Sequence, residues 1–165
     1  MTGAIEWLKA RAPGFNLAEN EINAITDFSL LWSLFESRIV NRNANATALC
    51  TVVEGWHASN MLVPALFDEE LAYLRDRYHP GAGFSHHFPG LRLQRSDREP
   101  LVKRVLQGTD NDPVHRQCAA LIVVYRYRNN LFHGEKWTYG LEDQFGNFTA
   151  ANAILTKALD RYGNL

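Results

Sequence analysis

Residues 113–134 read PVHRQCAALIVVYRYRNNLFHG, and this strongly apolar stretch predicts the helix around which the fold is organised. Asp112 stands just before it, where its carboxylate can accept hydrogen bonds from the first N–H groups of a helix. Pro113 suits the first helical position, because the N–H that proline lacks has no intrahelical partner there. Gly134 permits the left-handed turn that ends many helices. We therefore expect a helix from Pro113 to Gly134.

Similar periodicity predicts further helices on both sides of this stretch. Between Ala18 and about Val40, apolar residues recur every three or four positions, which places them on one helical face. Further helices are expected from about Ala46 to Met61, over residues 66–78, around Leu101–Leu106, and from about Thr149 to Tyr162. Residues 1–17 contain a short amphipathic piece broken by Pro13-Gly14, which we interpret as an N-terminal extension.

The remaining sequence contains no pattern that predicts a sheet. Residues 79–91 are rich in Gly and His and predict an irregular loop. There is no sustained two-residue alternation and no internal repeat. The length of 165 residues suits one domain with a real core. The sequence therefore predicts a single all-α domain over residues 1–165, a bundle of five or six helices.

Composition is that of an ordinary globular protein, with 46% hydrophobic and 21% charged residues. No apolar run approaches the roughly 20 residues that a bilayer-spanning helix needs, and the first residues do not resemble a signal peptide. Cys50 and Cys118 show no metal-ligand spacing, so we interpret them as small core residues. We expect a cytoplasmic protein without a membrane segment, a metal or a cofactor.

Charge is distributed unevenly along the chain. Residues 1–91 contain six Lys and Arg against ten Asp and Glu, whereas residues 92–136 contain nine against five. The basic residues of this second segment are Arg92, Arg95, Arg98, Lys103, Arg104, Arg116, Arg126, Arg128 and Lys136. A local positive field of this kind attracts a polyanion even when the net charge is only −1. The alternative is an ordinary solvated helix face.

The end of the apolar helix contains the residues from which a function can be argued. Arg128 is followed directly by Asn129, and four positions separate it from His133. This pattern resembles the signature of the HEPN superfamily, which is an Arg, a polar residue and a His after four intervening positions. The sequence RNNLFHG of residues 128–134 most resembles this motif as it occurs in the HEPN domains of abortive-infection and other defence proteins.

The resemblance implies a helical fold, homodimerisation and metal-independent endoribonuclease activity. In such enzymes the Arg and His of both protomers converge on one cleft. The resemblance also implies single-stranded RNA as substrate, a role as a toxin or antiphage effector, and an antitoxin or defence-system protein as partner. The best-known HEPN toxins have a modifiable Tyr two positions after the His. Glu135 stands there in this chain, so neutralisation through that Tyr is not implied.

The chemistry of these side chains suits RNA cleavage. A protonated His133 at a helix carboxyl end, where the dipole favours a cation, is a general acid for the leaving 5′-oxygen. Arg128 can clamp the phosphate oxygens in the transition state. The ribose 2′-hydroxyl would be the nucleophile, and the His133 of the second copy would accept its proton. Residues five apart lie roughly 140° apart on a helix, so Arg128 must reach around the helix edge.

Several further side chains are candidates for the same site. We expect Asn129 to orient His133 or the phosphate, because residues four apart on a helix can touch. Glu36 falls within an apolar helical sector, where a carboxylate needs a partner; it either braces Arg128 or pairs with Arg38 or solvent. The candidate substrate-binding residues are Arg126, Asn130, Tyr127, Lys136 and Arg116. Tyr127 is equally compatible with the core or a dimer interface.

Two alternatives remain at this point. A non-catalytic HEPN module would bind RNA or a nucleotide, or scaffold a larger defence complex. Alternatively, Arg128 is a surface residue and His133 only caps a helix. His79, His86 and His87 have neither the helical spacing nor the accompanying carboxylates of a metal site, so we interpret them as loop residues.

Overall fold

The computed structural model describes residues 3–12, 15–41, 43–134, 141 and 143–165. All regular secondary structure among these residues is helical, and they contain no strand. The α-helices are α1 (Ala4–Arg11), α2 (Glu19–Arg38), α3 (Ala46–Ala58), α4 (Asp68–Tyr78), α5 (Glu99–Leu106), α6 (Pro113–Phe132) and α8 (Phe145–Tyr162). Two short 3₁₀ helices, η1 (Phe88–Leu91) and η2 (Arg95–Asp97), lie between α4 and α5. The predicted all-α class is confirmed.

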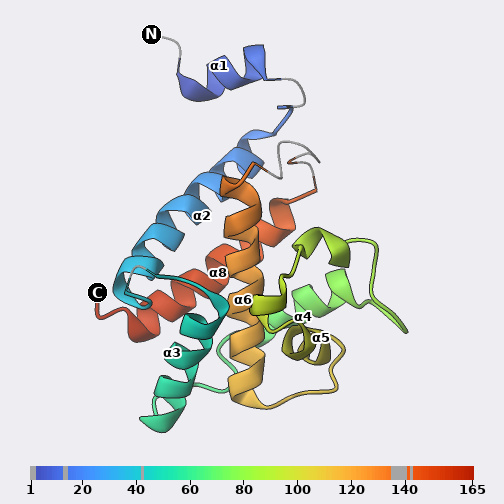
Figure 1. Cartoon of the computed structure of the whole chain (residues 1–165). Coiled ribbons are helices and arrows are strands. Elements are labelled where there is room, and N and C mark those ends of the chain that lie inside the picture. Colours follow the sequence, from blue (N-terminus) through green and yellow to red (C-terminus); the bar gives the residue numbers. More distant parts are fainter. Residues whose placement is uncertain (1–2, 13–14, 42, 135–140, 142) are drawn as a thin grey trace.

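Helix α6 runs through the centre of the bundle, with the other helices arranged around it (Figure 1). It packs against α3, α4, α5 and α8, and residues Cys118 to Val124 are at most 1% exposed. Helix α1 buries none of its residues and lies beyond the start of α2 (Figure 1). Apart from α1, the described part of the chain therefore contributes six α-helices to the bundle, in agreement with the predicted five or six.

Both predicted ends of α6 are present. The Asp112 carboxylate accepts hydrogen bonds from the N–H groups of Val114 and His115, at 2.9 and 3.1 Å. Pro113 occupies the first turn, and Gly134 follows the helix with φ +77°. The sequence therefore predicted both boundaries of this helix correctly, because each depends on one local residue type.

Other boundaries shifted where local signals were weak. Helix α8 begins at Phe145, four residues before the expected Thr149, because Asn147 and Phe148 are buried and packing extends the first turn. Phe148 packs on Phe28 of α2, with ring centroids 5.1 Å apart. Helix α3 ends at Ala58 rather than Met61, because Asn60 adopts a left-handed conformation with φ 57°.

Among the described helices, none has both the length and the apolar character needed to cross a bilayer.

The segment between α4 and α5 is irregular, as the sequence predicts, but it is not loosely attached. Leu91 is 1% exposed, and η1 packs against α6. Arg92 and Arg98 both adopt left-handed backbone conformations, with φ of 52° and 53°. Between these two turns, η2 packs against α3, and its Asp97 reaches Arg126 of α6.

Candidate functional site

His133 caps the carboxyl end of α6. Its backbone N–H donates to the carbonyl of Asn129 at 2.9 Å, and the chain then turns at Gly134. A Cβ at Gly134 would meet nothing within 4 Å, so the positive φ alone explains the glycine. The imidazole of His133 is exposed and is therefore available to a ligand.

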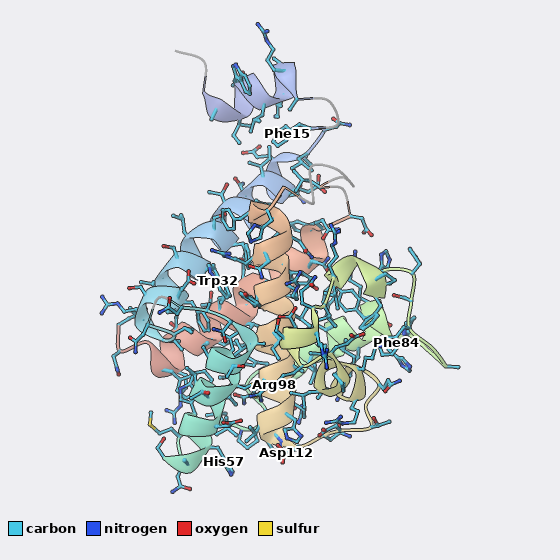
Figure 2. All side chains as sticks on the ribbon, in the orientation of Figure 1. Phe15, Trp32, His57, Phe84, Arg98 and Asp112 are labelled. Atoms are coloured by element: carbon cyan, nitrogen blue, oxygen red, sulfur yellow. The ribbon has the colours of Figure 1, made fainter. Side chains whose placement is uncertain are left out.

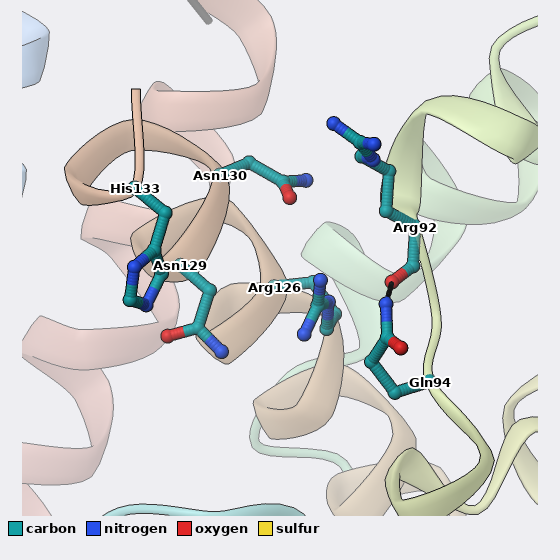
Figure 3. Close-up of a pocket in the computed structure, with 6 residues that line it drawn as sticks. All are labelled: Arg92, Gln94, Arg126, Asn129, Asn130 and His133. Atoms are coloured by element: carbon teal, nitrogen blue, oxygen red, sulfur yellow. Dashed lines mark hydrogen bonds between the residues drawn. The ribbon is translucent and has the colours of Figure 1, made fainter. Parts of the chain in front are cut away.

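A pocket of about 260 Å³ lies beside this helix end. The residues that line it come from α6 and from the segment after η1, and Figure 3 shows them around one space: Arg92, Gln94, Arg126, Asn129, Asn130 and His133. The lining contains two guanidinium groups, three amides and one imidazole, and none of these described residues carries a carboxylate. Such a set of groups is suited to an anionic ligand with further polar groups.

Hydrogen bonds from α6 hold the segment after η1 in place. The Asn130 Nδ2 donates to the carbonyls of Gly90 and Leu91, at 3.1 and 3.3 Å. The Arg126 Nε donates to the same Leu91 carbonyl at 3.1 Å. Carbonyl oxygens only accept hydrogen bonds. The side-chain amide of Asn130 must therefore point its nitrogen, and not its oxygen, at these two carbonyls. Its Oδ1 is left as the acceptor atom on this wall.

A buried carboxylate completes the attachment. Asp97 lies 3.2 Å from the Arg126 Nη1, and the two side chains are 4% and 9% exposed. Its Oδ2 also accepts from the backbone N–H of Gln94 at 2.7 Å. Removing either member of a buried ion pair leaves the other charge without compensation, which is strongly destabilising. Asp97 therefore keeps Arg126 and Gln94 at the pocket wall.

Arg128 does not line the pocket. Its Nη1 donates to the Oδ1 of Asn129 at 3.0 Å, and its guanidinium lies 5.5 Å from the centre of the Phe132 ring. Its Nε is buried without a hydrogen-bond partner. Since a guanidinium only donates, the Asn129 amide must present its Nδ2 as the remaining donor. Asn129 thus links Arg128 to the pocket that contains His133. Positions five apart on a helix point in directions roughly 140° apart around its axis, which explains why Arg128 and His133 do not line the same pocket.

The structure does not bring Glu36 to the pocket. Its carboxylate accepts from the indole Nε1 of Trp32 at 3.2 Å and from the backbone N–H of Ala44 at 3.3 Å. These contacts join α2 to the turn that precedes α3. Neither the expected brace on Arg128 nor the alternative pair with Arg38 is among its interactions, because the nearby indole and backbone N–H groups satisfy the carboxylate.

Tyr127 belongs to the core and not to a substrate surface. It is 3% exposed, its hydroxyl lies 2.8 Å from that of Tyr78, and it donates to Asn147 at 3.1 Å. Burial raises the pKa of Tyr127 and raises that of Tyr78 to about 12. A buried ring has no face for a nucleobase, so the predicted substrate contact is wrong and the core alternative is correct.

Arg116, a further predicted substrate residue, is not among the residues that line the pocket. Arg116 is paired with Asp68 of α4. It precedes Arg128 by twelve residues, or about 18 Å along the helix, so its predicted role at the same site is not supported by its position. Lys136 lies outside the described residues.

Sequence reasoning did not identify Arg92, Gln94 and Asp97 as site residues. Arg92 was visible only as one member of the basic segment 92–136. Its φ of 52° and ψ of 44° are uncommon for a residue other than Gly or Asn, and such a conformation costs roughly 1–2 kcal/mol. Strain of this kind is often kept where it positions a side chain. An irregular segment has no periodic sequence pattern from which the position of Arg92 at a pocket could be predicted.

The histidines of the loop form no metal centre in the part of the chain that the structure describes, where no group of three or more His, Cys, Asp or Glu side chains is placed to hold an ion. His86 and His87 lie against each other, with ring centroids 3.9 Å apart, and His79 packs edge-on against Phe84. Figure 2 shows Phe84 at the side of the bundle, in the loop that follows α4. The interpretation as loop residues is consistent with these contacts.

Comparisons of the chain with protein-family models, with curated proteins and with solved structures found no match. The features of this protein that point to a function are therefore the motif at residues 128–134 and the pocket beside its end.

Proposed function

We propose that the chain is a HEPN-type endoribonuclease that cleaves single-stranded RNA without a metal, at a site completed by a second copy. The observation that carries this proposal is the position of His133 in one pocket with Asn129 and two arginines, Arg92 and Arg126. An exposed imidazole at a helix carboxyl end beside guanidinium groups suits acid catalysis on a phosphodiester. Under this proposal the protein acts in the cytoplasm as a toxin or antiphage effector that an antitoxin or other defence-system protein controls.

The reaction balances without a cofactor. The ribose 2′-oxygen forms a bond to phosphorus, and the bond from phosphorus to the 5′-oxygen breaks. Protonated His133 gives its proton to the leaving 5′-oxygen, while the His133 of the second copy accepts the proton of the 2′-hydroxyl. The products carry a 2′,3′-cyclic phosphate and a 5′-hydroxyl. DNA lacks the nucleophile and should not be cleaved.

Arg128 is the reason for including a second copy. In one chain it reaches the pocket only through Asn129. The side chain of Phe132 between Arg128 and His133 is 56% exposed, which provides an apolar contact at the helix end. A twofold axis at this position would place the Arg128 of one copy near the pocket of the other. The guanidinium would then stabilise the charge that develops on the phosphate oxygens.

The decisive experiment is cleavage of labelled single-stranded RNA in the presence of EDTA. We expect the wild type to cut and to leave 2′,3′-cyclic phosphate ends, and His133→Ala to lose activity by about 100-fold or more. The matched control is His57→Ala, because His57 is also an exposed histidine at the carboxyl end of a helix. Equal activity of wild type and His133→Ala, or cleavage that EDTA abolishes, would contradict the proposal.

The assembly requires a separate test. Mixing inactive Arg128→Ala and His133→Ala subunits should restore part of the activity, because one composite site would contain both native side chains. Sedimentation at micromolar concentration should show a dimer for the wild type. A monomer that cleaves RNA at full rate would contradict the shared site.

A second candidate function is a binding module without catalysis. Two contacts favour it: Asp97 neutralises the charge of Arg126, and Arg128 donates a hydrogen bond to Asn129. Both contacts use guanidinium N–H groups that a catalytic site would direct to the phosphate. Such a module would bind RNA or a nucleotide, or scaffold a larger complex. Tight RNA binding by wild type and His133→Ala alike, with no cleavage by either, would select this function.

A further inference from the structure

We infer that Arg92, Gln94 and Arg126 form a second phosphate subsite, which holds the phosphate adjacent to the cleaved one on the same RNA strand. The inference deepens the proposed function and rests on it for the identity of the strand. Arg92 and Gln94 lie on the pocket wall opposite His133, Arg126 lies between the two sides, and residues 92–94 were not predicted as part of a site.

The pocket has two chemically different sides. Asn129 and His133 come from the last turns of α6, whereas Arg92 and Gln94 come from the segment after η1 (Figure 3). Arg126 lies between these two sides in Figure 3. The volume of about 260 Å³ is larger than one tetrahedral phosphate requires and approaches the roughly 300 Å³ at which small-molecule pockets begin. There is room for more of the strand than the reacting group alone.

The second side is held in a fixed geometry. The Gln94 Nε2 donates to the carbonyl of Arg92 at 3.1 Å, and the Gln94 N–H donates to Asp97 at 2.7 Å. Asp97 in turn binds Arg126, which is anchored to Leu91. Arg92 is positioned by its left-handed turn. The Arg126 guanidinium is therefore fixed before a phosphate binds and loses little conformational freedom, which favours affinity, while the exposed Arg92 supplies the second guanidinium.

Hydrogen-bond partners also determine which amide atoms remain for a ligand. Gln94 and Asn130 both use their nitrogens on backbone carbonyls, so each retains its oxygen as an acceptor. The phosphodiester group of a strand has no O–H and offers these oxygens no donor. A nucleotide does, through its ribose hydroxyls or its base amino group. The combination of guanidinium donors with amide acceptors therefore fits a sugar–phosphate unit, whose phosphate accepts hydrogen bonds and whose sugar or base donates them.

The test measures binding with ligands that cannot be cleaved. The probes are a 2′-O-methyl dinucleotide with one internal phosphate and a 2′-O-methyl trinucleotide with two. We expect the wild type to bind the trinucleotide about tenfold more tightly, as one charge-assisted phosphate contact allows. Arg92→Gly should remove most of this difference, and Arg92→Lys should restore part of it. Glycine is chosen because it accepts the positive φ of this position without strain.

Arg98→Gly is the matched control. Arg98 has the same residue type and nearly the same φ, lies in the same segment, and does not line the pocket. This variant should keep the tenfold difference, whereas Arg92→Gly should also lower the salt dependence of trinucleotide binding by about one counterion. Circular dichroism checks that both variants are folded. Equal losses in the two variants, or no preference for two phosphates in the wild type, would overturn the subsite.

The outcome is separable from that of the cleavage experiment. A phosphate preference that depends on Arg92 in a protein that leaves RNA intact would establish the subsite and reject the nuclease. RNA cleavage that depends on His133, without any preference for the trinucleotide, would retain the nuclease and reject the subsite. Inorganic phosphate can also be added as a competitor of the trinucleotide. If it competes as strongly as the dinucleotide does, the site binds anions without recognising a nucleotide, and the inference is overturned.

Discussion

The two ends of α6 each carry an arginine paired with an aspartate, yet the pairs differ in what surrounds them. Near the start of the helix, Arg116 pairs with Asp68 of α4, and these side chains are 19% and 48% exposed. Near its end, Arg126 pairs with Asp97 of η2, and the exposures are 9% and 4%. The first pair lies at the surface between two helices, whereas the second is buried behind a pocket.

The comparison shows that residue type and helix position do not determine the role of a charge. Both arginines lie on the same helix and belong to the same basic segment of the sequence. Of the two, Arg126 also bonds a loop carbonyl and lines the pocket beside His133, because η1 packs against that part of the helix. A charge pair near solvent contributes little to stability, while a buried pair contributes through the cost of breaking it.

The largest expected effect comes from breaking the buried pair. Asp97→Asn keeps the size of the side chain but leaves the Arg126 charge uncompensated, so the free energy of unfolding should fall by roughly 3–5 kcal/mol. Asp68→Asn, at the other end of α6, should lower it by about 1 kcal/mol or less. Urea denaturation followed by circular dichroism measures both. Similar losses for the two variants would remove the distinction between the two ends.

An intermediate effect is expected on the core side of the carboxyl-terminal half of α6. Tyr127→Phe removes the hydroxyl that contacts Tyr78 and Asn147, and should cost about 1–3 kcal/mol of unfolding free energy. Affinity for RNA should stay unchanged, because Tyr127 is buried away from the pocket.

The control for this variant is Tyr125→Phe. Tyr125 is half-buried, and its ring lies 6.1 Å from that of Trp32, so the substitution preserves the ring contact. We expect a change of less than about 0.5 kcal/mol, the usual range for a substitution that removes no buried contact. Weaker RNA binding by Tyr127→Phe at unchanged stability would return Tyr127 to the substrate site.

The smallest effect is expected at the first turn of α6. Asp112→Ala removes the acceptor of two backbone N–H groups and should cost about 1 kcal/mol, whereas Asp112→Asn keeps an acceptor and should cost less. Thermal unfolding measures the difference. Neither variant should alter RNA binding, because His133 lies about 30 Å away along the helix. An altered affinity would mean that the two ends are coupled.

Particular residues explain which helix ends and faces could be predicted. Asp112, Pro113 and Gly134 marked the ends of α6 correctly, since each acts on the backbone of its own turn. The spacing of Phe28, Trp32 and Phe35 identified the buried face of α2. The boundary at Phe145 was missed because the contacts that extend α8 come from α2.

The candidate site was predicted only in part. Asn129 and His133 were correctly expected to come together, since positions four apart share a helix face. Arg126 and Asn130 were also placed at the site, and both line the pocket. Tyr127 was misplaced because the sequence of one helix does not say which of its faces meets the core. Glu36 was misplaced because its partners, Trp32 and Ala44, satisfy it locally.

The sequence by itself determined the helices, the caps of α6 and the order of residues in its last turns. These features depend on contacts within about four residues, which periodicity and capping residues report directly. Only the tertiary structure decided that Arg92, Gln94 and Asp97 face that helix end, across about 30 to 40 residues of chain. Apart from the Asp97–Arg126 ion pair, the contacts that do this are hydrogen bonds from side chains to loop backbone, and any loop sequence offers the same carbonyl groups. A pocket made by such contacts therefore leaves no pattern in the sequence of the loop that forms it.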